Sequence, residues 1–123
     1  MSEMTYAQAA RLGLQEEMRR DPTVWALGED LGYEGGMAGQ YSDLQAEFGA
    51  DRIVDTPISE STIMGAAVGA ALAGTRPIAE LRFSDFAMCA VDELVNQAAK
   101  AQALIIVRAD PDQIASEREP GCI

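Results

Sequence analysis

The turn Asp55-Thr56-Pro57-Ile58-Ser59-Glu60-Ser61 is the strongest candidate for a chemical site, because it combines carboxyl and hydroxyl groups between two elements. It follows an apolar run that predicts a strand and precedes a run of small residues that predicts a helix. Ligands of open α/β sheets bind at the carboxyl ends of strands, where this turn falls. Glu60 would lie near a helix N-terminus, which favours a carboxylate. From the pattern alone, Glu60 is either a binding residue or an ordinary first-turn acid, and the second is favoured.

Two other segments carry side chains that could contact a ligand. Phe83 and Phe86 flank a predicted strand end, where aromatic rings can form a flat wall, although core packing is their more frequent role. Residues 28–39 include five glycines, together with Glu29 and Asp30. This segment lacks the spacing of phosphate-binding loops, and its acids would repel a phosphate, so a solvent-exposed loop is the simpler interpretation.

Composition excludes several kinds of chemistry. The 123 residues include no histidine, which rules out a Ser-His-Asp triad, a histidine base and histidine metal ligands. Cys89 and Cys122 form no Cys-x-x-Cys pair, so we expect neither a zinc site nor a disulfide framework. We interpret Cys89 as a small buried residue rather than a nucleophile, because no base is near it in sequence.

The net charge of −11 predicts that the chain binds neither nucleic acid nor an anionic membrane, since both would repel its surface. No apolar run approaches the roughly 18 residues that a membrane span needs. The first residues lack the basic and apolar regions of a secretory signal. We therefore expect a cytoplasmic protein that does not act at a membrane.

Helical and extended patterns alternate along the chain, and this order predicts the fold class. Thr5 with Gln8, and Ser42 with Gln45, have the spacing of capping boxes that begin helices. The expected elements are helices at 6–20, 42–49, 62–73 and 85–101, and strands at 24–27, 52–55, 78–83 and 104–107. We predict an α/β domain with a mainly parallel sheet and helices on both faces.

The helix expected at 62–73 contains Gly65 and Gly69 among small residues. Each glycine costs a helix roughly 1 kcal/mol relative to alanine, so the pair predicts close approach of another backbone. We assign residues 1–108 to the α/β domain and expect residues 109–123, which are polar and include two prolines, to form a tail.

These segments together resemble one family, the β subunits of pyruvate and related 2-oxo acid dehydrogenases, which decarboxylate their substrates with thiamine diphosphate. The string Asp-Thr-Pro-Ile-Ser-Glu at 55–60 is the most specific part of the resemblance. The similarity extends over about residues 4–101. The other segments that carry it are residues 27–30, 48–54, 65–74, 76–80, 83–86 and 96–100.

The resemblance implies the thiamine-diphosphate-binding fold, of the pyrimidine-domain type that transketolase shares. It implies that Glu60 is catalytic, because the matching glutamate hydrogen-bonds the ring nitrogen of the aminopyrimidine and favours the tautomer that lets the cofactor act as its own base. It further implies that Phe86 stacks on the pyrimidine ring and that Ile58 lies beside it. Glu29 matches an acid that lines a polar, proton-carrying passage between two active sites.

Two departures from the family pattern limit what this chain would do alone. The Gly-Asp-Gly…Asn element that holds the diphosphate through Mg²⁺ is absent, and in this family the α subunit supplies it. The chain would therefore hold half a site, within a heterotetramer that includes a second β chain and serves a lipoyl acyltransferase core. Family chains also continue into a second domain, whereas residues 101–123 do not match that continuation, so we expect a truncated domain.

Three functions remain open from the sequence. The first is a β-subunit half-site that is inactive without its α subunit. The second is a non-catalytic remnant that acts at most as an oligomerisation module, since a missing domain would leave apolar surface uncovered. The third is an α/β module that binds an unrelated small molecule. Similar β chains handle pyruvate, branched-chain 2-oxo acids and acetoin, so the substrate is also open.

Overall fold

The computed structural model describes residues 3–103 and 105–110. Its four strands form one parallel sheet in the order β2-β1-β3-β4, so the chain enters the sheet at an inner position. The strands are β1 (Val24–Gly28), β2 (Ile53–Asp55), β3 (Arg76–Phe83) and β4 (Ile106–Asp110). The parallel sheet confirms the predicted α/β class, because parallel strands need helical crossovers between them.

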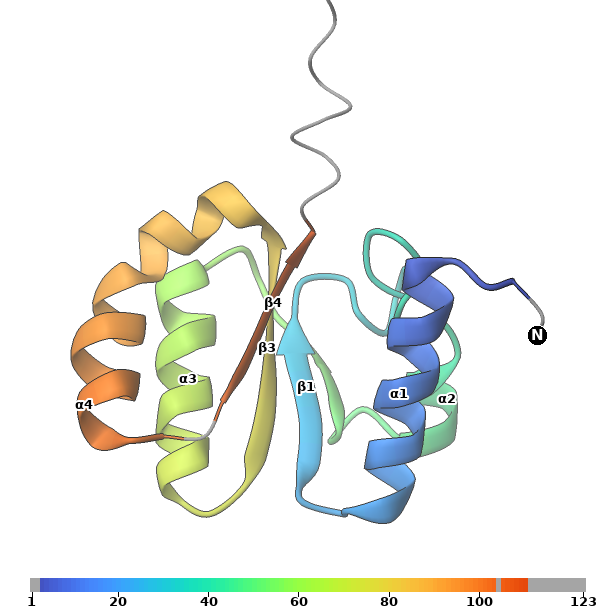
Figure 1. The fold of residues 1–123 in the computed structure, drawn as a ribbon, viewed down its shortest axis with the longest axis horizontal. Helices are drawn as coiled ribbons and strands as arrows, with labels where there is room; N and C mark the ends of the chain where they lie inside the picture. Colours follow the sequence, from blue (N-terminus) through green and yellow to red (C-terminus); the bar gives the residue numbers. More distant parts are fainter. Residues whose placement is uncertain (1–2, 104, 111–123) are drawn as a thin grey trace, which may run out of the picture.

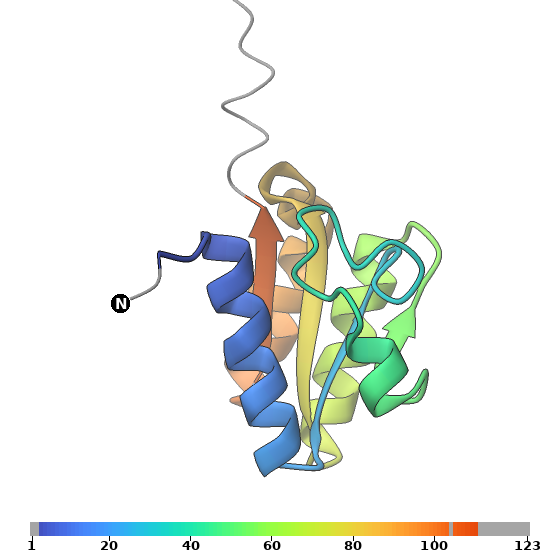
Figure 2. The same cartoon turned by 90° about the vertical axis from the view of Figure 1, so that its right-hand side faces the viewer.

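Helices cover both faces of the sheet, as predicted (Figure 1, Figure 2). α1 (Tyr6–Arg20) and α2 (Leu44–Phe48) lie on one face, and α3 (Glu60–Leu72) lies on the other. A helical run lies beside α3 and leads from β3 to β4; it comprises η1 (Ser84–Ala90), η2 (Glu93–Ala98) and α4 (Ala99–Ala101). Among the described helices, none is long and apolar enough to cross a membrane.

Each face of the sheet has its own apolar cluster. Beneath α1 and α2, Met18, Leu44 and Ile53 are essentially inaccessible to solvent. Beneath α3, Met64 and Leu81 are equally buried. Successive side chains of a strand point to opposite faces, so the short apolar strands can serve both clusters at once.

The capping box predicted at the start of α1 is confirmed. The backbone N–H of Thr5 donates to Oε1 of Gln8 at 2.8 Å, and the backbone N–H of Gln8 donates to Oγ1 of Thr5 at 3.2 Å. These two bonds satisfy amide groups that have no partner within the helix. The N-terminus of α1 is therefore determined by residues three positions apart.

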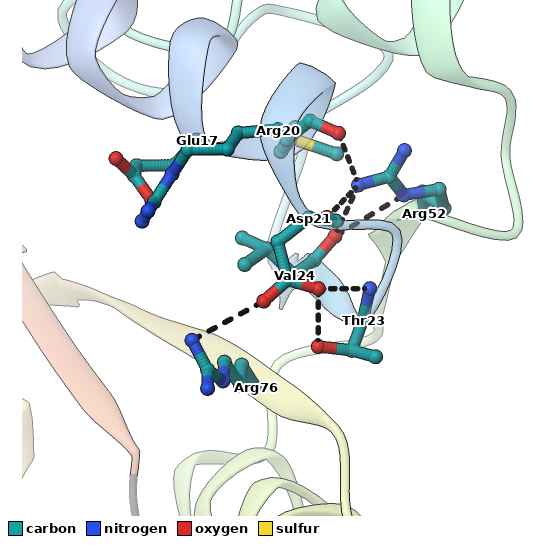
Figure 3. Close-up of polar contacts among 8 residues, drawn as sticks. Glu17, Arg20, Asp21, Thr23, Val24, Arg52 and Arg76 are labelled. Carbon is teal, nitrogen blue, oxygen red and sulfur yellow. Dashed lines mark hydrogen bonds and ion pairs between the residues drawn. The ribbon is translucent and has the colours of Figure 1, made fainter.

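Arg52 ties the other end of α1 to the amino ends of the strands (Figure 3). Its Nη2 donates to the carbonyl oxygens of Met18, Asp21 and Val24 at 2.8, 3.0 and 2.7 Å. The carboxylate of Asp21 also pairs with Nη1 of Arg76 at 3.2 Å. One guanidinium thus satisfies carbonyls at the helix end and the strand start, so the amino edge of the sheet is occupied by structural contacts.

The capping box predicted from Ser42 and Gln45 is wrong. The cap of α2 is Asp43, in a left-handed conformation with φ +65°, and its side chain makes no capping bond. The Gln45 side chain instead donates to the carbonyl of Ile53 at 2.8 Å and to Asp55 Oδ2 at 3.4 Å. The side chain of Gln45 therefore bonds to β2 instead of to the backbone of the predicted cap, Ser42.

The helix predicted at 85–101 is confirmed in its extent, but its geometry is irregular. The segment is helical throughout, but it begins as the 3₁₀ turns of η1 and continues through the wider π turns of η2. The last strand starts at Ile106 rather than at residue 104, and it ends at Asp110, beyond the predicted domain boundary at 108. Residues 111–123 of the predicted tail lie outside the described residues, so this boundary stays a prediction.

The close backbone approach predicted at Gly65 and Gly69 is not found within the described chain. A Cβ placed on Gly69 would meet nothing within 4 Å, and one on Gly65 would meet the Glu93 carboxyl group at an ordinary 3.7 Å. A close approach occurs instead at Gly28. A Cβ there would lie 2.7 Å from Cβ of Glu80 and 2.9 Å from its carbonyl oxygen, on the neighbouring strand.

Candidate functional site

Three neighbouring strands end at the carboxyl edge of the sheet, and each end leads into a predicted site residue. Glu29 follows the last residue of β1, and the turn to Glu60 follows the last residue of β2. Gly28 and Asp55 are direct partners in the parallel register, so these two segments leave the sheet at the same level. Phe86 lies in η1, immediately after β3. This edge is where open parallel sheets bind ligands.

Glu60 is the first residue of α3 and is half-buried. Ser59 precedes it in an extended conformation, and its carbonyl accepts the first helical hydrogen bond, from Ile63 N at 2.9 Å. Ile58 lies in the turn and is 78% exposed, so its side chain is free to contact another molecule. The helix thus begins where the predicted site requires, two residues earlier than expected.

The first turn of α3 is tied to η1 by one hydrogen bond. The hydroxyl of Ser61 donates to the carbonyl of Cys89 at 2.6 Å. Cys89 itself is exposed, so the expectation that it is buried is wrong. The bond fixes the helix that carries Glu60 against the turns that carry Phe86.

Glu29 is buried, with 8% of its surface exposed. Burial raises the pKa of its carboxyl group, and the negative charges of Glu60 and Asp30 raise that pKa further, whereas Arg82 acts in the opposite direction. The charge of Glu60 can act on Glu29 because the fold brings their elements together. Perturbed carboxyl groups of this kind are frequent in functional sites, although ion-pair networks also produce them.

Phe86 keeps about a third of its surface exposed. Its ring packs edge-to-face on Phe83, with centroids 5.0 Å apart and planes at 80°. An edge-to-face contact fixes one ring while leaving its faces available for stacking. The ring can therefore serve as a wall for a flat ligand at this edge.

Two buried hydroxyl groups at the same edge have no hydrogen-bond partner among the described residues. They are Oγ1 of Thr56, directly after β2, and Oγ of Ser84, directly after β3. A buried hydroxyl without a partner costs free energy, so both groups are available to bind a ligand or water. Sequence analysis included Thr56 in the candidate turn but did not single out Ser84, although both residues follow strands whose ends were predicted.

Arg82 was also missed, and it lies at the centre of an acidic cluster. Its Nη1 forms an ion pair with Asp30 and lies 3.9 Å from Oε2 of Glu29, while its Nη2 lies 3.3 Å from Oε2 of Glu34. These acids belong to the glycine-rich loop that sequence analysis interpreted as solvent-exposed. A charged residue within the mainly apolar strand β3 was the available signal.

A buried polar network lies behind this loop. The carboxylate of Glu80 is 3% exposed and accepts hydrogen bonds from Tyr41 Oη at 2.9 Å and Gln40 Nε2 at 3.2 Å. Both donors are buried as well. A buried carboxylate is tolerated when its oxygens are hydrogen-bonded, so the network joins the end of the loop firmly to β3.

A groove of about 400 Å³ lies away from this edge, lined by residues of α1, β3 and β4 that include Leu14, Ile78 and Ile106. None of the four predicted site residues lines it. In the described part of the chain, no group of three or more cysteine and acidic side chains could hold a metal ion. The candidate site is therefore the carboxyl edge, with Glu29, Glu60 and Phe86 around it.

Residues 2–117 match the model of the transketolase pyrimidine-binding domain family. The chain therefore belongs to this family, in agreement with its parallel α/β sheet.

Individual relatives match over most of the chain. A 2-oxoisovalerate dehydrogenase subunit beta of Bacillus subtilis is 48% identical over 100 residues, which are 81% of this chain and 31% of the relative. A pyruvate dehydrogenase E1 component subunit beta of Staphylococcus epidermidis is 42% identical over 102 residues, 83% of this chain and 31% of the relative. The Rhizobium meliloti subunit of the same name is 44% identical over 100 residues, 81% of this chain and 22% of the relative. The chain thus spans less than a third of the length of these relatives.

Proposed function

We propose that this chain forms the pyrimidine-binding half of a thiamine diphosphate site and contributes it to the decarboxylating component of a 2-oxo acid dehydrogenase. The observation that carries the proposal is the position of Glu60, in the first turn of α3 at the carboxyl edge, beside Glu29 and near the strand end that leads to Phe86. The names of the relatives supply the reaction class, because they are β subunits of pyruvate and 2-oxoisovalerate dehydrogenases.

The residues at the edge fit an aminopyrimidine ring. Such a ring offers a flat face and polar nitrogen atoms, and the edge offers a partly exposed aromatic ring, a half-buried carboxyl group and two buried hydroxyls without partners. In this proposal Glu60 binds the ring nitrogen, Phe86 stacks on the ring and Ile58 packs beside it. Thiamine diphosphate, when bound, supplies the electron sink for decarboxylation.

The remaining assignment concerns Glu29. Its raised pKa allows it to exchange a proton nearer to neutral pH than an ordinary carboxyl group can. We assign it to proton transfer at the polar edge next to Glu60, rather than to direct contact with substrate.

The proposed partner is an α subunit that holds Mg²⁺ and the diphosphate group, since the chain lacks the Gly-Asp-Gly…Asn element that the family uses for this purpose. The complete assembly would contain a second β chain and would deliver its acyl product to a lipoyl acyltransferase in the cytoplasm. The 2-oxo acid would be selected together with the α subunit.

A second candidate function is that of a non-catalytic oligomerisation module. Three apolar side chains of the helical run, Met88, Val91 and Val95, are 75, 41 and 58% exposed. The chain also spans less than a third of its relatives. In this case the chain would associate with other subunits without binding the cofactor.

The test is a calorimetric titration of thiamine diphosphate with Mg²⁺ into the chain mixed with the α subunit from the same organism. Saturable binding that needs both chains is the expected result. A folded mixture that binds nothing would favour the oligomerisation module.

The matched variants are Glu60→Gln at the site and Glu16→Gln on the exposed side of α1. We expect Glu60→Gln to lower the decarboxylation rate of the assembled enzyme by about 10² or more, because it removes the proton-exchanging group, while Glu16→Gln leaves the rate unchanged. Equal rates in the two variants would overturn the role of Glu60. Binding of thiamine diphosphate that Glu60→Ala leaves unchanged would point to an unrelated binding mode.

A further inference from the structure

The loop that follows β1 is held over the carboxyl edge at two separate points. Towards β2, the backbone N–H of Gly32 donates to Oδ1 of Asp55 at 2.7 Å. Towards β3, the guanidinium of Arg82 bonds to Asp30 and Glu34. The loop therefore bridges the strands on both sides of β1, and its position depends on these side-chain contacts.

Arg82 contacts both ends of the tight turn at residues 30–34 of the loop. Asp30 has φ +53°, a left-handed conformation that costs non-glycine residues free energy although aspartate tolerates it better than most. Its carbonyl accepts hydrogen bonds from the backbone N–H groups of Glu34 and Gly36, both at 3.1 Å. A fork of two nitrogen atoms on Arg82 thus spans Asp30 and Glu34 at the two ends of one turn.

The same guanidinium is the cation next to the acids of the site. Its Nη1 lies 3.9 Å from Oε2 of the buried Glu29. The groups that act on Glu29 are Arg82 from β3, Glu60 from α3 and Asp30 from the loop itself. Of these, Arg82 favours the ionised form, whereas both acids oppose it.

We propose that Arg82 is a positioning residue of the site: its guanidinium fork fixes the turn at residues 30–34 and thereby holds the Glu29 carboxyl group at the carboxyl edge of the sheet. The inference rests on the proposed function for its relevance to catalysis, but the contacts belong to this chain alone. Arg82 acts through Glu29 and the loop.

The proposal separates two effects of Arg82, its charge and its fork shape. Lysine retains the charge but presents a single ammonium group, which cannot hold two carboxylates in a fixed fork. Arg82→Lys should therefore preserve most of the electrostatic effect on Glu29 and lose part of the order of the loop. Arg82→Gln should lose both. Arg76→Gln is the control, because Arg76 begins the same strand and pairs with Asp21 at the opposite edge.

The experiment compares these three variants of the full chain by NMR. Carboxyl resonances followed through a pH titration report the pKa of Glu29, and hydrogen exchange reports the protection of the Glu34 and Gly36 amides. In Arg82→Gln we expect the pKa of Glu29 to rise further and the two amides to exchange roughly tenfold faster or more, since charge-assisted hydrogen bonds are lost. In Arg82→Lys we expect faster exchange with a smaller pKa change, and in Arg76→Gln neither.

Each outcome bears on the inference separately from the proposed function. An unchanged Glu29 pKa and unchanged exchange in folded Arg82→Gln would overturn it, as would equal changes in Arg76→Gln. If Arg82→Gln does not fold, Arg82→Lys tests the inference instead. In that variant the Glu34 and Gly36 amides must exchange faster while the pKa of Glu29 changes little. Failure of thiamine diphosphate to bind with the α subunit would refute the proposed function while leaving these NMR effects in place.

Discussion

The negative charge of Glu60, in the first turn of α3, raises the pKa of Glu29 at the end of β1. Burial of Glu29 is the larger cause, and Arg82 opposes both. The two glutamates follow different strands, and the charge of one acts on the other because the carboxyl ends of β1 and β2 leave the sheet at one level. Burial and the nearby negative charges together favour the protonated form of Glu29.

Replacing Glu29 with glutamine should stabilise the chain near neutral pH. The pKa of Glu29 is raised above its ordinary value of 4.5 in the folded state, so the stability that its protonated form contributes is present at low pH and is lost as the pH rises through the folded pKa. The variant should therefore unfold at higher urea concentration at pH 7, and this difference should vanish below about pH 4. Glu16→Gln serves as the exposed control. A destabilised Glu29→Gln variant at pH 7 would contradict the direction of the shift.

Replacing Tyr41 with phenylalanine should destabilise the fold by about 0.5–1.5 kcal/mol, the usual net contribution of one hydrogen bond. The hydroxyl of Tyr41 donates to the buried carboxylate of Glu80, which would lose one of its donors. Urea unfolding monitored by circular dichroism measures the change in free energy. Tyr6→Phe is the control, because Tyr6 is 74% exposed, and equal stabilities for both variants would refute the importance of the network.

Replacing Gly28 with alanine should cost about 1–3 kcal/mol, because the new methyl group would overlap Glu80 on β3. Gly13→Ala should instead stabilise by roughly 0.5–1 kcal/mol, since Gly13 lies within α1 and nothing lies within 4 Å of an added Cβ. Thermal unfolding of the two variants should move the melting temperature in opposite directions. If both variants shift the melting temperature in the same direction, the close approach of β1 to β3 is not the reason for glycine at position 28.

Local signals predicted the elements well where their partners were also local. The Thr5–Gln8 box worked because both of its hydrogen bonds are completed within three residues. The Ser42–Gln45 box failed because Gln45 found a carbonyl on β2 once the strand was placed beside it. A capping pattern therefore predicts a cap only when no tertiary partner competes for the same side chain.

The residues of the candidate site also differ in whether the sequence could indicate them. The turn that ends in Glu60 could be located from the sequence because a strand end and a helix start bound it on either side. The hydrogen bonds from Arg82 to the loop could not be predicted, because the partners Asp30 and Glu34 are 52 and 48 residues away in the chain. No periodicity or capping rule connects residues at such separations.

The sequence by itself determined the alternation of strands and helices, the absence of histidine chemistry and the turn that carries Glu60. These follow from composition and from interactions between residues a few positions apart. The tertiary structure decided that Glu29 is buried, that it feels the charge of Glu60, and that Arg82 holds its loop. Burial and charge interactions depend on distances in space, and these are set only when the parallel strands align their carboxyl ends.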